Sequence, residues 1–230
     1  MGIDSDCEED DTILKFGPSD GTEFGPRVIF GHGVGGLDKY ANTFIADMVE
    51  RWSKDPRLAH VTFLLPTAPT RPVEMLGNKE VPAWFDCAQD ASMPNGWRCN
   101  YDHLKEAAET YDNLAGSWGG TNDRTVFAGF SNGGATALYA GLTGCGRREN
   151  AGILVMSSLL VAQDEVLECD NSGTTTPVLL CYGDADPYVS DRDVASTKSF
   201  LMTTRWGPRR AWASSSRRCG ANLGVLVIEL

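Results

Sequence analysis

The chain has 230 residues, which suffice for one domain with a full hydrophobic core but not for two of ordinary size. Its formal net charge of −11 argues against nucleic acid as the main partner, because a polyanion repels an acidic surface. No apolar run approaches the roughly 20 residues of a membrane span, so we expect no integral membrane segment and at most transient membrane contact.

The seven cysteines are scattered and never form a C-x-x-C pair. We therefore expect reduced thiols in a cytoplasmic protein, and no metal site, because Cys and His do not cluster. Charge and composition divide the chain into three parts. Residues 1–24 form an acidic tail that we expect to be disordered, residues 25–204 form one domain, and residues 205–230 form an atypical Arg/Ser-rich segment.

Short apolar runs alternate with longer amphipathic ones along the central domain. In chain order, the pattern predicts strands within 27–33, 60–66, 124–130, 151–158 and 177–184, and helices within 41–53, 102–118 and 133–144. The strand candidates are continuously apolar, as in strands that are buried on both faces. The order predicts an α/β fold with a mostly parallel sheet and helices on both faces, in which the chemistry gathers at the carboxyl ends of the strands.

The stretch "GFSNGG" places Ser131 between a predicted strand and a predicted helix. This G-x-S-x-G pattern, in that context, is typical of a nucleophile elbow, where glycines are needed because side chains would collide in so tight a turn. The helix that follows directs backbone N–H groups, that of Asn132 first, at any anion forming beside Ser131. The alternative is an ordinary strand–helix turn.

Two other strand ends carry polar or glycine-rich loops. "HGVGG" follows the first predicted strand, and the N–H of Val34 there would complete an oxyanion hole with that of Asn132, while His32 is expected to orient the loop. "GDADP" follows the last predicted strand, where the acid of a hydrolase triad belongs. We prefer Asp186, because Pro187 rigidifies the backbone after it, and keep Asp184 as a helper or turn residue; a plain Asp/Pro turn is the alternative.

These motifs, together with "TAPTRPVEMLGNKEVPAWFD" between them, resemble the acyl-protein thioesterase (phospholipase/carboxylesterase) family over most of residues 26–190. The resemblance implies the α/β-hydrolase fold. It also implies hydrolysis of acyl thioesters or carboxylic esters, the substrates being acylated proteins, lysophospholipids or small esters. It makes Ser131 the nucleophile, Asp186 the triad acid, and Val34 and Asn132 the oxyanion donors. It also places Trp84 and Phe85 near an acyl-binding groove, with a role in the hydrophobic core as the alternative for both, and Asp86 is expected to be structural. This chemistry requires no cofactor and no metal.

The sequence departs from the family at the triad histidine, which members carry after the last strand. The three histidines of this chain, His32, His60 and His103, all precede Ser131, so no triad histidine is found. We expect the segment after about Pro208 not to be the family's C-terminus, through a frameshift, an alternative splice or a faulty gene model. Three functions remain open: a serine hydrolase of acylated proteins or lipids, a catalytically dead relative that binds them, or a carboxylesterase that acts on small esters. The sequence gives no oligomeric state.

Overall fold

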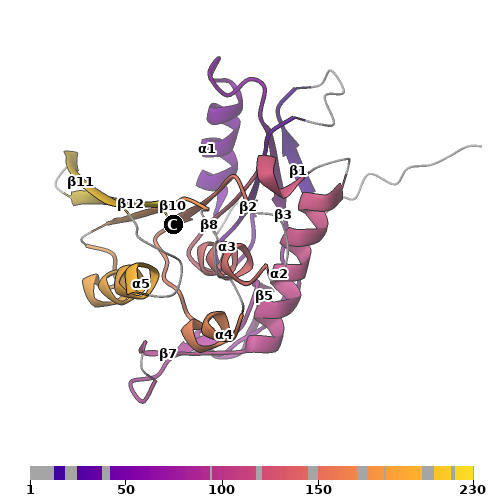
Figure 1. Ribbon diagram of the computed structural model, residues 1–230. Helices are drawn as coiled ribbons and strands as arrows, with labels where there is room; N and C mark the ends of the chain where they lie inside the picture. Colours follow the sequence, from indigo (N-terminus) through magenta and orange to yellow (C-terminus); the bar gives the residue numbers. More distant parts are fainter. Residues whose placement is uncertain are drawn as a thin grey trace, which may run out of the picture.

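The computed structural model describes residues 13–18, 25–37, 42–93, 95–117, 121–144, 150–169, 176–183, 185–203, 210–218 and 221–229. An eight-stranded sheet runs through the molecule in the order β1-β3-β2-β8-β9-β10-β12-β11 (Figure 1). Its five central strands are parallel, and they are β3 (Thr62–Pro66), β2 (Arg27–Gly31), β8 (Thr125–Phe130), β9 (Gly152–Met156) and β10 (Val178–Gly183). These are the five strands that the apolar runs predict.

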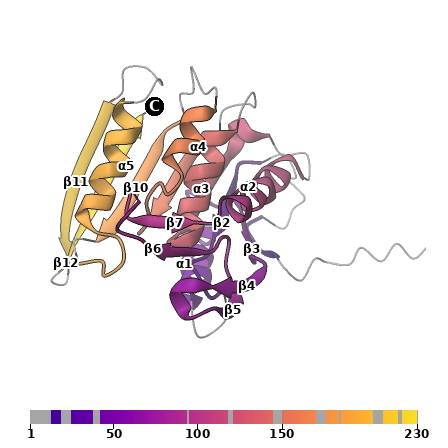
Figure 2. The same ribbon diagram turned by 90° about the horizontal axis from the view of Figure 1, so that it is seen from below.

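Helices cover both faces of this sheet. One face carries α1 (Thr43–Ser53), and the other carries the remaining helices (Figures 1 and 2). These are α2 (Tyr101–Gly116), α3 (Asn132–Thr143), α4 (Gln163–Glu168) and α5 (Asp191–Thr203). The fold is therefore the α/β-hydrolase type that the sequence predicts.

Successive side chains of the strands point to opposite faces and so feed two hydrophobic cores. Phe30 packs with Ile45 and Val49 beneath α1, whereas its neighbour Ile29 belongs to the larger core beneath α2 to α5. Helix α3 runs through that larger core and is buried on almost all sides, which is why its sequence is apolar and small rather than amphipathic. The serine turn before α3 is thus anchored in the larger of the two hydrophobic cores.

Two antiparallel ribbons lie outside the main sheet, between β3 and α2 in the chain. The first consists of β4 (Thr70–Val73) and β5 (Lys79–Pro82), joined through the short helix η1 (Glu74–Leu76). The second consists of β6 (Cys87–Gln89) and β7 (Trp97–Cys99). A further short helix, η3 (Asn122–Arg124), leads into β8. Figure 2 shows both ribbons on the side of the sheet that carries α2 to α4.

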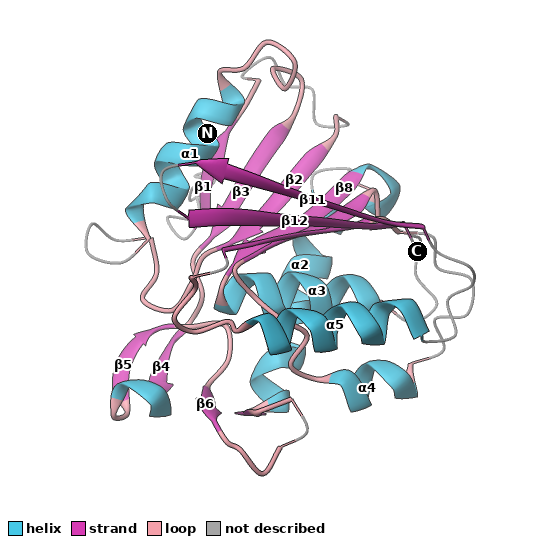
Figure 3. Cartoon of the chain, turned by 90° about the vertical axis from the view of Figure 1, so that its left-hand side faces the viewer, coloured by secondary structure: helices cyan, strands magenta, loops and turns pink. Residues whose placement is uncertain are grey.

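Both ends of the chain add strands to the five that the alternating pattern predicts. β1 (Ile13–Phe16) pairs antiparallel with β3, so this part of the 1–24 tail is ordered in the sheet, a correction to the expected disorder. Within the 205–230 segment, β11 (Arg210–Arg218) and β12 (Ala221–Glu229) form a hairpin, and β12 pairs antiparallel with β10 (Figure 3). The apolar run at the C-terminus lies inside the sheet, and β11 forms its edge.

Candidate active site

Ser131 occupies the turn between β8 and α3 in a backbone conformation that side chains rarely adopt, with φ 52° and ψ −118°. Its N–H donates to the carbonyl oxygen of Met156 (2.9 Å), and its own carbonyl oxygen accepts from the hydroxyl of Ser158 (2.7 Å). These bonds tie the turn to the end of β9, which lies beside β8 in the sheet. The strain is therefore held in place by neighbouring structure, as in a nucleophile elbow.

The glycines around Ser131 are required by close backbone contacts. A Cβ atom on Gly129 would lie 2.2 Å from the carbonyl oxygen of Gly133, and one on Gly133 would lie 2.4 Å from the carbonyl carbon of Gly31. Helix α3 therefore begins in direct contact with the end of β2. This contact brings the "HGVGG" loop next to the serine.

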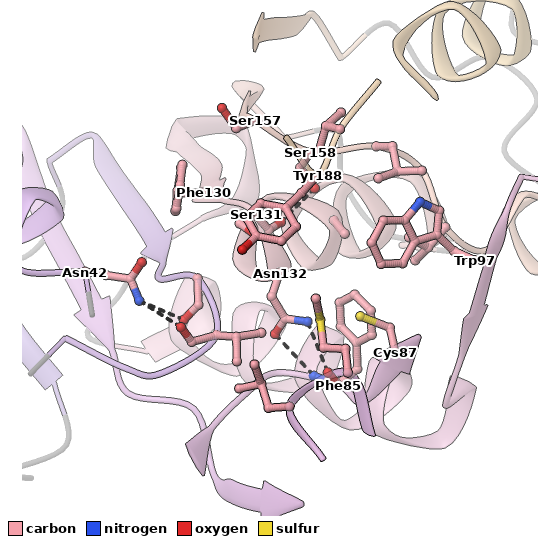
Figure 4. Close-up of a pocket in the computed structure, with 18 residues that line it drawn as sticks. Asn42, Phe85, Cys87, Trp97, Phe130, Ser131, Asn132, Ser157, Ser158 and Tyr188 are labelled. Carbon is pink, nitrogen blue, oxygen red and sulfur yellow. Dashed lines mark hydrogen bonds between the residues drawn. The ribbon is translucent and has the colours of Figure 1, made fainter. Parts of the chain in front are cut away.

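A cavity of about 290 Å³ opens beside Ser131 (Figure 4). Polar groups gather at the serine end, and the remainder of the wall is apolar. The apolar lining residues are Met75, Leu76, Phe85, Cys87, Trp97, Phe130, Ala135, Leu159, Val161 and Val189. Of these, the sequence pointed only to Phe85, because the others come from β8, α3, loops and short ribbons that lie far apart in the chain and share no motif.

Both residues expected to supply oxyanion donors, Val34 and Asn132, line the same cavity as Ser131. Asn132 is the first residue of α3, where backbone N–H groups have no acceptor within the helix. The loop that contains Val34 is held by the side chain of Asn42, which donates to the carbonyl oxygens of Gly33 (3.1 Å), Val34 (3.2 Å) and Gly36 (2.8 Å). Asn42 is a positioning residue that no motif identifies in the sequence.

The side chain of Asn132 fastens the "WFD" segment to the start of α3. Its Oδ1 accepts from the N–H groups of Trp84 (2.7 Å) and Phe85 (3.4 Å), and its Nδ2 donates to the carbonyl oxygen of Phe85 (3.0 Å). Phe85 consequently faces the cavity (Figure 4). Asp86 accepts from the N–H of Glu74 through Oδ1 (2.8 Å) and so braces the segment.

Trp84 lies behind the cavity wall and does not line the cavity. Its side chain is fully buried, and the ring packs edge-on against Tyr111 at a centroid distance of 5.7 Å. Its Nε1 donates to the carbonyl oxygen of His32 (3.0 Å). The hydrogen-bond partner and the packing site together make Trp84 a core residue, because a buried indole N–H needs an acceptor.

Asp186 lies in the loop between β10 and α5, as the sequence predicts. Its Oδ1 accepts from the N–H groups of Tyr188 (2.9 Å) and Val189 (3.0 Å), and these two residues line the cavity. The carboxylate thus shapes the loop that closes one end of the cavity. Asp184 lies outside the described residues.

All three histidines of the chain are described, and none of them lines the cavity beside Ser131. His32 is buried, and both ring nitrogens are occupied. Nδ1 lies 2.6 Å from the carbonyl oxygen of Gly33, and Nε2 accepts from the N–H of Ala68 (2.9 Å). These partners require the neutral ring with its proton on Nδ1. His60 is exposed just before β3, at the amino end of the sheet.

His103 lies in the first turn of α2, next to the capping residue. Its Nδ1 accepts from the N–H of Asp86 (3.4 Å), and its backbone N–H donates to the side chain of Asn100 (3.1 Å). His103 therefore helps to hold the first turn of α2 and the "WFD" segment in place. The site as described brings together Ser131, Val34, Asn132 and the Asp186 loop, but no histidine.

The burial of His32 predicts a stability that falls at acidic pH. Burial lowers the pKa of His32, although its hydrogen bond to Gly33 opposes that shift. Below about pH 6.5 the unfolded chain binds a proton that folded His32 does not, so the free energy of unfolding should fall by at most about 1.4 kcal/mol per pH unit for this group. Above that pH the contribution is fully present.

Urea unfolding of the chain and of His32→Gln at a series of pH values checks this. In His32→Gln, the free energy of unfolding should fall less steeply on acidification than it does in the unmodified chain. His60→Gln is the matched control, because that ring is exposed and not buried as His32 is. Equal pH dependence in the chain and in His32→Gln would contradict the assignment.

Among the described residues, no group of three or more His, Cys, Asp or Glu side chains is placed to hold a metal ion. In the same part of the chain, no helix has the length and apolar character needed to cross a membrane.

Comparison with known proteins identifies the family. The profile of the phospholipase/carboxylesterase family matches residues 20–208. The chain is 32% identical to acyl-protein thioesterase 1 of Neurospora crassa over 182 residues, which cover 76% of this chain and 72% of that protein. It is 30% identical to acyl-protein thioesterase 1 of Mycosarcoma maydis, with coverage of 82% and 80%. The crystal structure of Zea mays acyl-protein thioesterase 2 has the same fold, with a TM-score of 0.64, 23% identity and 82% of each chain covered. The chain therefore belongs to the phospholipase/carboxylesterase family, a family of ester and thioester hydrolases.

Proposed function

We propose that the chain acts on long-chain acyl thioesters or carboxylic esters, carried by proteins or lipids in the cytoplasm, with Ser131 as the nucleophile. The observation that carries the proposal is the strained Ser131 at the polar end of an apolar cavity. The cavity volume of about 290 Å³ lies at the lower end of small-molecule sites, which suits one acyl chain beside the serine. The similarity to acyl-protein thioesterases favours a protein-bound acyl group.

In this proposal, Ser131 Oγ attacks the acyl carbonyl carbon, and the thiol or alcohol leaves to give an acyl-enzyme that water then hydrolyses. The N–H groups of Val34 and Asn132 stabilise the negative charge on the carbonyl oxygen during both steps. Asp186 is proposed as the acid that would orient a catalytic base. None of the three histidines of the chain supplies that base from the position described above.

Exposed apolar side chains at the cavity support an acyl substrate. Met75 is 39% exposed, Leu76 46% and Tyr188 62%, and all three contribute to the lining. Large apolar groups gathered at the mouth of a pocket mark a binding surface rather than ordinary exposure. These side chains would contact the acyl chain of a protein or a lipid as it enters the cavity, and this contact does not require a membrane-spanning segment.

A second function is favoured by the absence of a histidine from the cavity. A cavity that retains its apolar wall but lacks a base would bind acylated proteins or lipids without cleaving them. Both functions use the same cavity, so binding alone does not separate them.

Hydrolysis by the chain and by Ser131→Ala separates the two. Both proteins are assayed on a p-nitrophenyl ester and on a palmitoyl thioester, and binding of a fluorescent fatty acid is titrated in parallel. Hydrolysis that the variant lacks, with fatty-acid binding in both, supports the hydrolase. Equal background hydrolysis with retained binding supports the non-catalytic binder, and no binding by either protein overturns the acyl site itself.

A further inference from the structure

Two cysteines face each other across the β6–β7 ribbon. Cys87 and Cys99 are directly opposite in the register. The N–H of Asn100 donates to the carbonyl oxygen of Asp86 (2.9 Å), so the adjacent pair is a hydrogen-bonded one. Because the two kinds of pair alternate along an antiparallel ladder, Cys87 and Cys99 form a non-hydrogen-bonded pair, in which Cα atoms lie about 4.5 Å apart and side chains approach most closely. This spacing falls within the range that a disulfide bridges.

The two thiols are in contact and reduced in the structure. Both cysteines are free, and the Cys99 thiol hydrogen-bonds with Cys87. That hydrogen bond and burial raise the pKa of Cys99, so Cys99 keeps its proton. Cys87 lines the cavity beside Ser131 and is therefore the thiol that a small reagent in the cavity meets first (Figure 4).

The ribbon that carries this pair forms part of the cavity wall. Cys87 and Trp97 both line the cavity from its two strands. Arg98 fastens the ribbon to η1 through an ion pair with Glu74 (2.7 Å). The residues of η1 after Glu74 line the cavity as well. A covalent link across the β6–β7 ribbon would therefore restrain the part of the cavity wall that the ribbon and η1 form together.

We propose that Cys87 and Cys99 are a modification site for low-molecular-weight disulfides such as oxidised glutathione, which convert the pair into a reversible disulfide that stiffens the cavity wall. The Cys87 thiolate attacks one sulfur of glutathione disulfide, and the first glutathione leaves as a thiolate that takes up a proton. Cys99 then loses its proton, and its sulfur attacks the Cys87 sulfur of the mixed disulfide and expels the second glutathione. Two protein thiols are oxidised, and one disulfide is reduced to two thiols.

The first measurement is intact mass and peptide mapping of the folded chain after equilibration with oxidised and reduced glutathione. The chain should lose the mass of two hydrogens, with a cross-link between the peptides that contain Cys87 and Cys99, and dithiothreitol should reverse the change. Cys99→Ser should instead retain one glutathione on Cys87. Cys169→Ser and Cys181→Ser are matched controls, because these cysteines lie elsewhere in the fold, after α4 and in β10, and should not affect the cross-link.

The second measurement is amide hydrogen exchange over residues 86–100, which requires no catalytic activity. Exchange should slow by about tenfold or more in the oxidised chain, because the cross-link suppresses local opening of the ribbon, and it should not change in Cys99→Ser. A cross-link between other cysteines, no cross-link in the oxidising buffer, or a cross-link without slower exchange would each overturn the proposal. The cross-link and the exchange rates do not depend on hydrolysis, so a chain without hydrolase activity would still test this proposal.

Discussion

The purified chain should hydrolyse p-nitrophenyl butyrate with a kcat roughly a million-fold below that of a relative with a complete Ser-His-Asp triad, and added imidazole should raise the rate. A serine hydroxyl is a weak nucleophile until a base takes its proton. His32 has both ring nitrogens engaged, His103 serves the start of α2, and His60 lies at the amino end of the sheet. If Val34 and Asn132 act as the proposed oxyanion donors, they and the cavity should together retain a rate of about 10³–10⁴ over the reaction in water.

Imidazole can act here because the cavity opens directly onto Ser131 and has room for a small ring. The rescued rate should rise with the concentration of the neutral base, and hence with pH from about 6 to 8, since imidazole accepts the serine proton only when it is unprotonated. Ser131→Ala is assayed at every imidazole concentration, because imidazole itself cleaves activated esters. The serine-dependent rate is the difference between the two proteins.

Two outcomes would contradict this expectation. A full rate without imidazole would mean that a histidine of the chain reaches Ser131 after a rearrangement, and Gln variants of His32, His60 and His103 would identify it. No serine-dependent gain at any imidazole concentration would mean that Ser131 is not poised as a nucleophile. The non-catalytic binder would then be the better description.

Gly133→Ala should destabilise the fold by more than about 3 kcal/mol, a large part of the 5–15 kcal/mol that stabilises an ordinary domain. The added Cβ would lie 2.4 Å from both the carbonyl carbon and the carbonyl oxygen of Gly31, and 2.6 Å from the carbonyl oxygen of His32. These are backbone atoms of a central strand and its loop, so they cannot move aside as the end of a side chain could. Either α3 separates from β2 or the sheet deforms.

Gly116→Ala is the matched control, because Gly116 ends α2 and a Cβ there would meet no atom within 4 Å. Its free energy of unfolding should stay the same or rise by up to about 1 kcal/mol, since alanine restricts the unfolded chain. Urea unfolding of both variants, with circular dichroism of Gly133→Ala to detect loss of folded protein, makes the comparison. Equal stabilities would show that the backbone around Ser131 yields far more easily than its contacts indicate.

The parallel core of the sheet could be predicted because its strands are buried on both faces and therefore read as continuous apolar runs. The serine turn could be predicted because its geometry demands glycines on both sides. The other elements lacked such signals. β1 follows an acidic stretch, α5 begins with "DRD" and has little amphipathic pattern, and the strands of the β6–β7 ribbon are three residues each.

Apart from Phe85, which the family motif "PAWFD" indicates, the residues at the cavity were predictable only where a motif coincides with the end of a strand. Ser131, Asn132, Val34 and the loop of Asp186 satisfy that condition. Trp84 shows the limit, because a buried indole and a ligand-facing one read alike in a sequence, and only packing against Tyr111 decides between them. No sequence motif identifies Asn42, since its side chain donates to three backbone carbonyl oxygens of a loop and any residue type supplies such acceptors.

The side-chain amide of Asn132 takes the place of a peptide group. It accepts from one backbone N–H of the "WFD" segment and donates to a backbone carbonyl there, as a partner strand would, and so supplies a single rung of a β-ladder. Asn132 is also the residue bonded directly to Ser131. Phe85 lines the cavity, so the same amide that holds this cavity wall also belongs to the residue that follows Ser131 in the chain. A movement of Phe85 would therefore be transmitted to the start of α3, one peptide bond away from Ser131.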